Sequence, residues 1–171
     1  MPHEECDPEQ TQAVTDFRRP VSDRFFEDYT PGIDVTYGRV EVHDDDILRF
    51  ASEFDPQTIH TDPAAAASGP FGGLIASGWH TASLMTRIFA TQFLNDAASL
   101  ASPGVDELRW LQPVRPGDVL SVRFEVTDAR ESRSKPDRGI VTTRITVLNQ
   151  RAEPVLTMTA VNLIRRRPNP S

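Results

Sequence analysis

The residues best suited to chemistry in this sequence are a carboxylate and an imidazole, Asp55 and His60, with four residues between them. A carboxylate beside an imidazole can hold and polarise one water molecule, as general acid–base catalysis requires. Pro56 follows Asp55 directly and stops a preceding helix, because proline disfavours helical geometry in the residue before it. We therefore expect a bent loop at 55–62 that brings both side chains to one point.

A third residue, Gly78, lies near the start of a long apolar segment that we expect to be helical. The first turn of a helix presents free N–H groups and a partial positive charge. A glycine there lets a ligand approach the backbone, and such donors stabilise an oxyanion such as the enolate of a thioester. The three residues together supply the parts needed to add water to an α,β-unsaturated thioester, or to remove it.

The spacing of Asp55 and His60 alone leaves another interpretation open. An aspartate that ends a helix and a histidine with a structural role would produce the same pattern.

The elements that would position these residues are one strand, then helices, then four strands. We expect helices at 47–54, 64–68 and 74–94, and the last is apolar nearly all round, so that something must wrap it. Strands are expected at 35–43, 105–111, 119–129, 140–148 and 155–165. This order predicts an α+β fold, in which an antiparallel sheet curls around one long helix.

Aspartates precede two of the expected helices. One of Asp44, Asp45 and Asp46 is expected to cap the helix at 47–54, and the others to favour its positive end. Asp62 is expected to cap the short helix whose first turn suits Pro63. Capping explains these carboxylates without a metal.

The length of 171 residues fits one domain. We expect a flexible N-terminal arm at 1–24, a single domain at 25–167 and a tail at 168–171. The one cysteine, Cys6, excludes an intrachain disulfide. The formal net charge of −7 gives no general reason to bind nucleic acid or an anionic membrane.

The first twenty residues lack the apolar core of a signal peptide. No apolar run approaches the roughly 20 residues that span a bilayer. We therefore expect a cytoplasmic protein.

Residues 50–87, FASEFDPQTIHTDPAAAASGPFGGLIASGWHTASLMTR, strongly resemble the hydratase-2 motif of the MaoC-like dehydratases, a family that includes the (R)-specific enoyl-CoA hydratases. The resemblance extends from about Phe25 to Arg166. Residues 103–118, PGVDELRWLQPVRPGD, are similar to the family's strand and the turn that follows it.

This resemblance implies a hot-dog fold, a long central helix wrapped by a curved antiparallel β-sheet, usually paired as a homodimer or higher assembly. It implies that Asp55 and His60 activate the water and protonate the α-carbon, and that the N–H of Gly78 forms the oxyanion hole. Which of the pair holds the proton at each step stays open. The implied substrate is an acyl-CoA thioester, and no cofactor is implied.

Two positions depart from the family pattern. The common motif has Asn-Pro shortly before the histidine, where this chain has Asp55-Pro56-Gln57, so either Gln57 supplies the missing amide or the loop differs in shape. Many members have histidine where this chain has Ser77, and Thr86 falls where some members have a hydroxyl residue near the site. We take Gln57, Ser77 and Thr86 as candidates for substrate binding.

Trp79 and His80 complete the substrate-binding candidates. The alternative for His80 is packing against a strand or a partner subunit, and Trp79, like Trp110, also suits a core or an interface. No metal is expected at His60 and Asp62, because no third ligand follows at metal spacing. Five basic residues are possible contacts for CoA phosphates or simply solvated charges: Arg109, Arg115, Arg133, Lys135 and Arg138.

Three functions therefore compete. The first is an acyl-CoA hydratase/dehydratase, which the FGG and IASG segments at 71–78 favour. The second is a hot-dog thioesterase, which would release free thiol from the same substrate. The third is a non-catalytic acyl-CoA-binding protein, which the two departures from the motif motivate.

Overall fold

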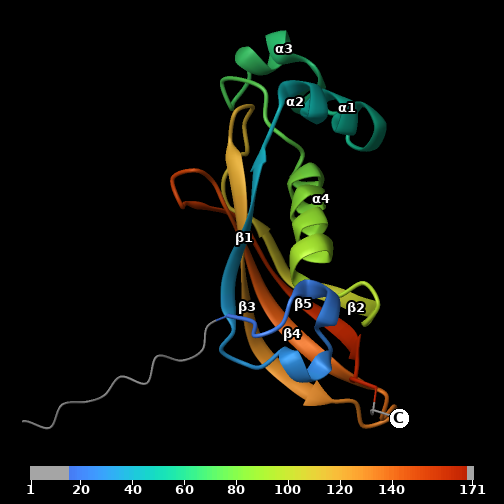
Figure 1. Ribbon diagram of the computed structural model, residues 1–171. Helices are drawn as coiled ribbons and strands as arrows, with labels where there is room; N and C mark the ends of the chain where they lie inside the picture. The colour runs from blue at the N-terminus through green and yellow to red at the C-terminus, as the bar shows by residue number, and fades with distance from the viewer. Residues whose placement is uncertain (1–15, 169–171) are drawn as a thin grey trace, which may run out of the picture.

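The computed structural model describes residues 16–168 and contains one antiparallel five-stranded sheet (Figure 1). The strands are β1 (Asp34–Glu41), β2 (Ser99–Trp110), β3 (Val119–Glu131), β4 (Arg138–Leu148) and β5 (Pro154–Arg165). Their order across the sheet is β1-β3-β4-β5-β2, which leaves β1 and β2 at the two edges. Together with the helix α4 (Gly78–Ile88), which lies along one face of this sheet (Figure 1), the arrangement confirms the predicted α+β class and the hot-dog fold.

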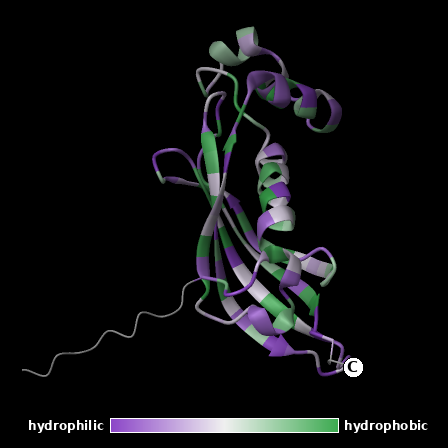
Figure 2. Cartoon of the chain, in the orientation of Figure 1, coloured by the Kyte–Doolittle hydropathy of each residue, from purple (hydrophilic) through white to green (hydrophobic). Residues whose placement is uncertain are grey.

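The central helix, α4 (Gly78–Ile88), continues as a π-helical turn, η3 (Phe89–Phe93). Helix α4 lies along one face of the sheet (Figure 1), and apolar residues recur along the helix and along the strands (Figure 2). The helix begins four residues later than predicted, because the residues before it are extended and the N–H of Ala76 donates to the carbonyl of Val114. At residues 74–77, hydrogen bonding to a distant segment therefore prevents the helix that the apolar pattern predicts.

Three short helices gather at one end of the molecule: α1 (Asp44–Phe54), α2 (Thr58–Thr61) and α3 (Pro63–Ala67) (Figure 1). The predicted cap of α1 is wrong, because His43 stands at the capping position and makes no side-chain cap. The three aspartates lie instead in the first turn, where the positive helix end favours carboxylates. The cap by Asp62 is confirmed, since its carboxylate accepts from the N–H groups of Ala64 and Ala65.

Two segments differ from the prediction, one through a local turn and one through strand pairing. The expected loop at 55–62 contains the single turn α2. Strand β2 begins at Ser99, six residues earlier than predicted, because it pairs with β5 as far as Ile164. None of the helices in the part of the chain that the structure describes is long and apolar enough to cross a membrane.

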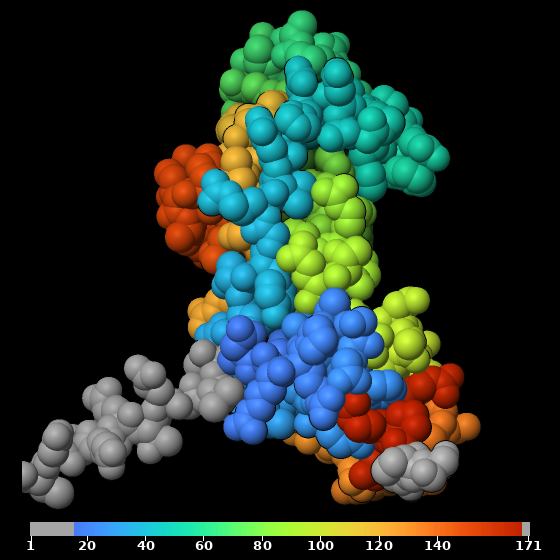
Figure 3. Space-filling view, viewed as in Figure 1, coloured from blue at the N-terminus to red at the C-terminus, as the bar shows by residue number. Residues whose placement is uncertain are grey.

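The N-terminal boundary of the domain also differs from the prediction. Arg24, assigned to the flexible arm, is 6% exposed and donates to the carbonyls of Gln92 and Phe93 at the end of η3. The ring of Phe17 packs on Tyr29 and Phe93. Figure 3 shows this segment, in dark blue, seated against the body of the protein. Residues 1–15, with Cys6, and 169–171 lie outside the described residues.

Phe93 lies at the centre of the aromatic core and is fully buried. Its ring centroid lies 4.7 Å from that of Phe124 and 5.2 Å from that of Phe89. We predict that Phe93→Ala lowers the free energy of unfolding by about 3–5 kcal/mol, the usual cost of truncating a buried phenylalanine. Phe54→Ala, at a position that is 65% exposed, serves as the control and should change stability little. Equal losses in urea denaturation would contradict this assignment of the core.

Candidate active site

Asp55 and His60 are brought together by a chain reversal at the end of α1. Asp55 ends that helix, and its N–H still donates to the carbonyl of Ala51. Pro56 prevents continuation, and the N–H of Gln57 turns back to the Asp55 carbonyl at 2.7 Å. The single turn α2 then places His60 on the same side as Asp55.

The imidazole of His60 is buried and fixed in orientation. Its Nδ1 lies 2.8 Å from the carbonyl oxygen of Ile75. Because a carbonyl only accepts hydrogen bonds, Nδ1 carries a proton, and in the neutral ring Nε2 is left with a free lone pair. Nε2 lies 3.6 Å from Oδ2 of Asp55, so the two groups are neighbours without a direct hydrogen bond.

The carboxylate of Asp55 is held by two side-chain donors. The Gln57 amide donates to Oδ1 at 2.7 Å, and the Ser77 hydroxyl donates to Oδ2 at 2.6 Å. These hydrogen bonds, and the nearby His60 ring, hold the pKa of Asp55 below its usual range, against partial burial. Asp55 is therefore ionised at neutral pH.

Ser77 joins this carboxylate to the start of α4. Its hydroxyl oxygen also accepts from the N–H of Trp79 at 3.2 Å, which caps the helix. Gly78 is the first helical residue, and its N–H makes no hydrogen bond within residues 16–168. That free donor sits at the positive end of the helix.

Asp55, His60 and Gly78 all line one cavity of about 470 Å³. The remaining lining is mostly apolar: Phe71, Ile75, Ala76, Trp79, Leu111, Pro113, Val114 and Val155, with Trp110 and a few polar groups. The cavity therefore offers an ionised carboxylate, an imidazole lone pair and an amide donor in apolar surroundings. Low local polarity strengthens electrostatic interactions with a bound reactant.

The other sequence-predicted residues divide into two groups. Gln57 and Trp79 line the cavity, and Trp79 is 57% exposed. Ser77 is 1% exposed, and its hydroxyl is occupied by Asp55 and the Trp79 amide. Direct substrate contact at Ser77 stays a prediction, and the structure gives its hydroxyl the role of holding the carboxylate.

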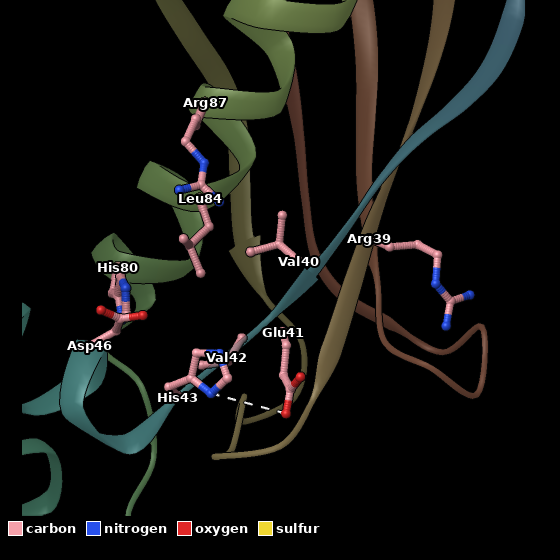
Figure 4. Close-up of a pocket in the computed structure, with 9 residues that line it drawn as sticks. All are labelled: Arg39, Val40, Glu41, Val42, His43, Asp46, His80, Leu84 and Arg87. Carbon is pink, nitrogen blue, oxygen red and sulfur yellow. Dashed lines mark ion pairs between the residues drawn. The ribbon is translucent and has the colours of Figure 1, made fainter.

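His80 and Thr86 do not line this cavity, so substrate contact by either stays a prediction. His80 is buried against α1, stacked on Phe50 with centroids 4.9 Å apart. It lines a separate cavity of about 280 Å³ beside Asp46 (Figure 4), and burial lowers its pKa. Thr86 lies two helical turns beyond Gly78 and lines a different cavity, with its hydroxyl donating to the Ala82 carbonyl.

Sequence reasoning missed the position of Trp110. A Cβ placed on Gly78 would lie 2.3 Å from the indole Nε1, so any other residue at position 78 requires this ring to move. Trp110 is 48% exposed, lines the cavity and packs edge to face with Trp79 at 5.3 Å. Strand β2 brings it there from 32 positions along the chain, and no local pattern signals that contact.

Among the five possible phosphate contacts, Arg115 lies beside the cavity. The preceding residue, Val114, lines the cavity. The guanidinium of Arg115 donates to the carbonyl of Phe71, which is another lining residue. Arg138 pairs instead with Asp137, and Arg109 lines a different cavity. Within residues 16–168 no group of three or more histidine, cysteine or acidic side chains is arranged to hold a metal ion.

Comparison with known proteins adds a family to this geometry. Residues 26–149 match the family model described as a MaoC like domain. The uncharacterized protein YdeM of Bacillus subtilis is 33% identical over 127 residues, which are 74% of this chain and 89% of YdeM. The 3-hydroxybutyryl-CoA dehydratase of Methylorubrum extorquens is 31% identical over 112 residues, which are 65% of this chain and 69% of that protein.

A solved structure agrees with both matches. The MaoC-like dehydratase from Rhodospirillum rubrum is 44% identical, superposes with a TM-score of 0.80, and covers 85% of this chain and 99% of its own.

The hydrogen bond from Ser77 to Asp55 predicts a measurable shift. We expect Ser77→Ala to raise the pKa of the Asp55 carboxyl, because the carboxylate loses a donor that favours its charged form. A ¹³C NMR titration of the side-chain carboxyl measures this change. Thr61→Ala is the matched control, since the Thr61 hydroxyl donates to the Gln57 carbonyl and not to Asp55. An unchanged Asp55 titration in Ser77→Ala would contradict the prediction.

The lowered pKa of Asp55 also makes the stability of the fold depend on pH. The ionised carboxylate stabilises the folded state fully above the pKa of Asp55 in the unfolded chain. This stabilisation is lost as the pH falls through the lower pKa of the folded state.

Proposed function

Because the chain belongs to the MaoC-like dehydratase family, we propose that it adds water to the α,β double bond of an acyl-CoA thioester, or removes water to form that bond. The observation that carries the proposal is the convergence of Asp55, His60 and the Gly78 amide on one cavity. The dehydratase relative from Methylorubrum extorquens supports the same class of reaction.

In this proposal Gly78 supplies the electrostatic part of the reaction. Its free N–H donates a hydrogen bond to the thioester carbonyl oxygen at the positive end of α4. Negative charge develops on that oxygen when the β-carbon is attacked, so the interaction strengthens towards the transition state.

His60 and Asp55 supply the water. The lone pair of His60 Nε2 takes a proton from a water molecule, while the ionised Asp55 accepts a second hydrogen bond and orients it. The hydroxyl oxygen bonds to the β-carbon, and the proton on Nε2 passes to the α-carbon. The proton taken from water is thus returned to the product, and dehydration runs through the same steps in reverse.

The substrate is proposed to be a CoA thioester, and the enzyme to need no cofactor. The groups above supply proton transfer and charge stabilisation, which are sufficient for hydration of a conjugated thioester. Arg115, beside the cavity, is proposed to contact a phosphate of the carrier.

The position of β2 at an edge of the sheet in residues 16–168 supports the homodimer that we propose. Strand β2 is an edge strand of twelve residues, and Val105, Trp110 and Leu111 on or next to it are 47%, 48% and 49% exposed. An exposed edge with apolar side chains favours pairing with another chain, and a second copy pairs across a two-fold axis. Since Trp110 and Leu111 also line the catalytic cavity, such a dimer would cover its open side.

Two substitutions test the catalytic roles. We predict that Asp55→Asn and His60→Ala each lower hydration of crotonyl-CoA by at least about a hundredfold, the scale of acid–base catalysis. The measurement is the loss of enoyl-thioester absorbance, with a thiol reagent to detect any thioesterase activity.

Matched controls exist for both substitutions. Asp62→Asn keeps a good helix cap and His43→Ala changes an exposed ring, so both should retain activity. Full activity in Asp55→Asn and His60→Ala would overturn the assigned roles. Free thiol from the wild type without hydration would identify a thioesterase instead.

A charge on the edge strand tests the dimer. We predict that the wild type sediments as a dimer and that Val105→Lys sediments as a monomer, because a charge at the strand interface opposes pairing. Phe54→Lys, at an exposed apolar position on α1, should leave the dimer intact. A monomeric wild type would refute the proposed pairing along β2.

A further inference from the structure

Asn162 of β5 is a buried polar residue for which the proposed reaction has no use. It is 5% exposed, and its Oδ1 has no hydrogen-bond partner within residues 16–168. An unsatisfied amide in a core is destabilising, and it requires an explanation such as a ligand.

Asn162 lines a second cavity, of about 320 Å³, between α4, β2 and β5. Most of its lining is apolar, including Met85, Phe89, Leu94, Val105, Met158 and Ala160. Two hydroxyls at this cavity are already satisfied: Thr86 donates to the carbonyl of Ala82, and Ser102 donates to that of Val161. The hydroxyl of Ser99 also lines the cavity, and Asn162 is the lining residue whose oxygen is buried without a partner in residues 16–168.

The second cavity lies along the same seam as the catalytic one. On β5, Val155 lines the catalytic cavity, and Met158, Ala160 and Asn162 line the second. On α4, Thr81 lines the first and Met85 the second, one helical turn further along. The two cavities share no lining residue. Thr86, at the second, lies about two helical turns beyond Gly78, so a chain that reaches Asn162 from the thioester must span at least that length.

The chemistry of the lining restricts what the chain carries. No lysine, arginine, aspartate or glutamate lines the second cavity, so a charged end group would be buried without a counterion. An asparagine side chain has an NH₂ group that donates and a carbonyl oxygen that accepts. A single hydroxyl group can pair with either, because it both donates and accepts hydrogen bonds.

We propose that Asn162 is a specificity-determining residue, which selects acyl thioesters that carry a neutral hydroxyl far along the acyl chain. This inference rests on the proposed hydratase function and deepens it. The hydroxyl contacts the amide of Asn162, and the methylene groups before it fill the apolar part of the seam. A plain alkyl chain of the same length leaves the buried amide without a partner, so the site discriminates against it.

The test compares matched enoyl-CoA substrates. The wild type is assayed with alkyl enoyl-CoAs and their ω-hydroxy derivatives, from hexenoyl to hexadecenoyl. We expect at least about a tenfold higher kcat/KM for the hydroxylated substrate at one or more chain lengths, because sites built for a hydroxyl reject the analogue that lacks it. Asn162→Leu, which is similar in volume and apolar, should reverse this preference.

Thr143→Val is the matched control. Thr143 is the neighbouring buried residue on β4 whose hydroxyl also lacks a partner in the described chain, but it does not line the cavity. Its substitution should leave the substrate preference unchanged, which separates ligand recognition from the removal of a buried polar group.

The outcomes separate this inference from the function itself. Absence of hydration for every substrate would refute the proposed function. If the wild type hydrates its substrates but prefers alkyl chains at all lengths, the role of Asn162 is refuted and the proposed function is retained. This outcome is measured on the wild type alone, so it does not depend on whether a variant folds. An unchanged preference in Asn162→Leu would also refute it.

Discussion

The hydrogen bond between the Ser77 hydroxyl and the Asp55 carboxylate is the interaction on which the site depends. It joins two segments 22 residues apart, the end of α1 and the start of α4. The same hydroxyl oxygen caps α4, so the position of the carboxylate and the position of the first helical amide are set by one atom. The second link is the contact of His60 with the Ile75 carbonyl, which fixes the ring and its tautomer.

The fold places these links at one end of a long apolar contact. Helix α4 lies along the sheet, and the aromatic residues near its far end anchor it through Phe93 and Phe124. Because the helix is fixed there, its first turn is held beneath Trp110 of the edge strand. The catalytic groups thus lie where the helix, the α1–α2 reversal and β2 meet.

The sequence predicts those parts of the site that depend on local chemistry. Pro56 signals the bend, and the glycine at a helix start signals the amide, so Asp55, His60 and Gly78 converge as expected. The strand-like sequences of β3, β4 and β5 likewise predict the sheet. Asp62 caps its helix as predicted because a cap involves residues only two or three positions away.

The features that sequence reasoning missed depend on distant contacts. His80 stacks on Phe50 of α1, and the ring of Trp110 lies directly against Gly78. The true start of α4 is set by a hydrogen bond from Ala76 to Val114. Asn162 has the sequence context of an ordinary strand residue, and only the packed sheet shows that its Oδ1 is buried without a partner among residues 16–168.

The most direct test of the central claim is a crystal structure of the Asp55→Asn variant with a bound enoyl-CoA. In that structure we expect the thioester oxygen to accept a hydrogen bond from the Gly78 amide, with the β-carbon facing His60 Nε2 and residue 55. A thioester bound with its carbonyl away from the start of α4, or with the double bond remote from both side chains, would contradict it.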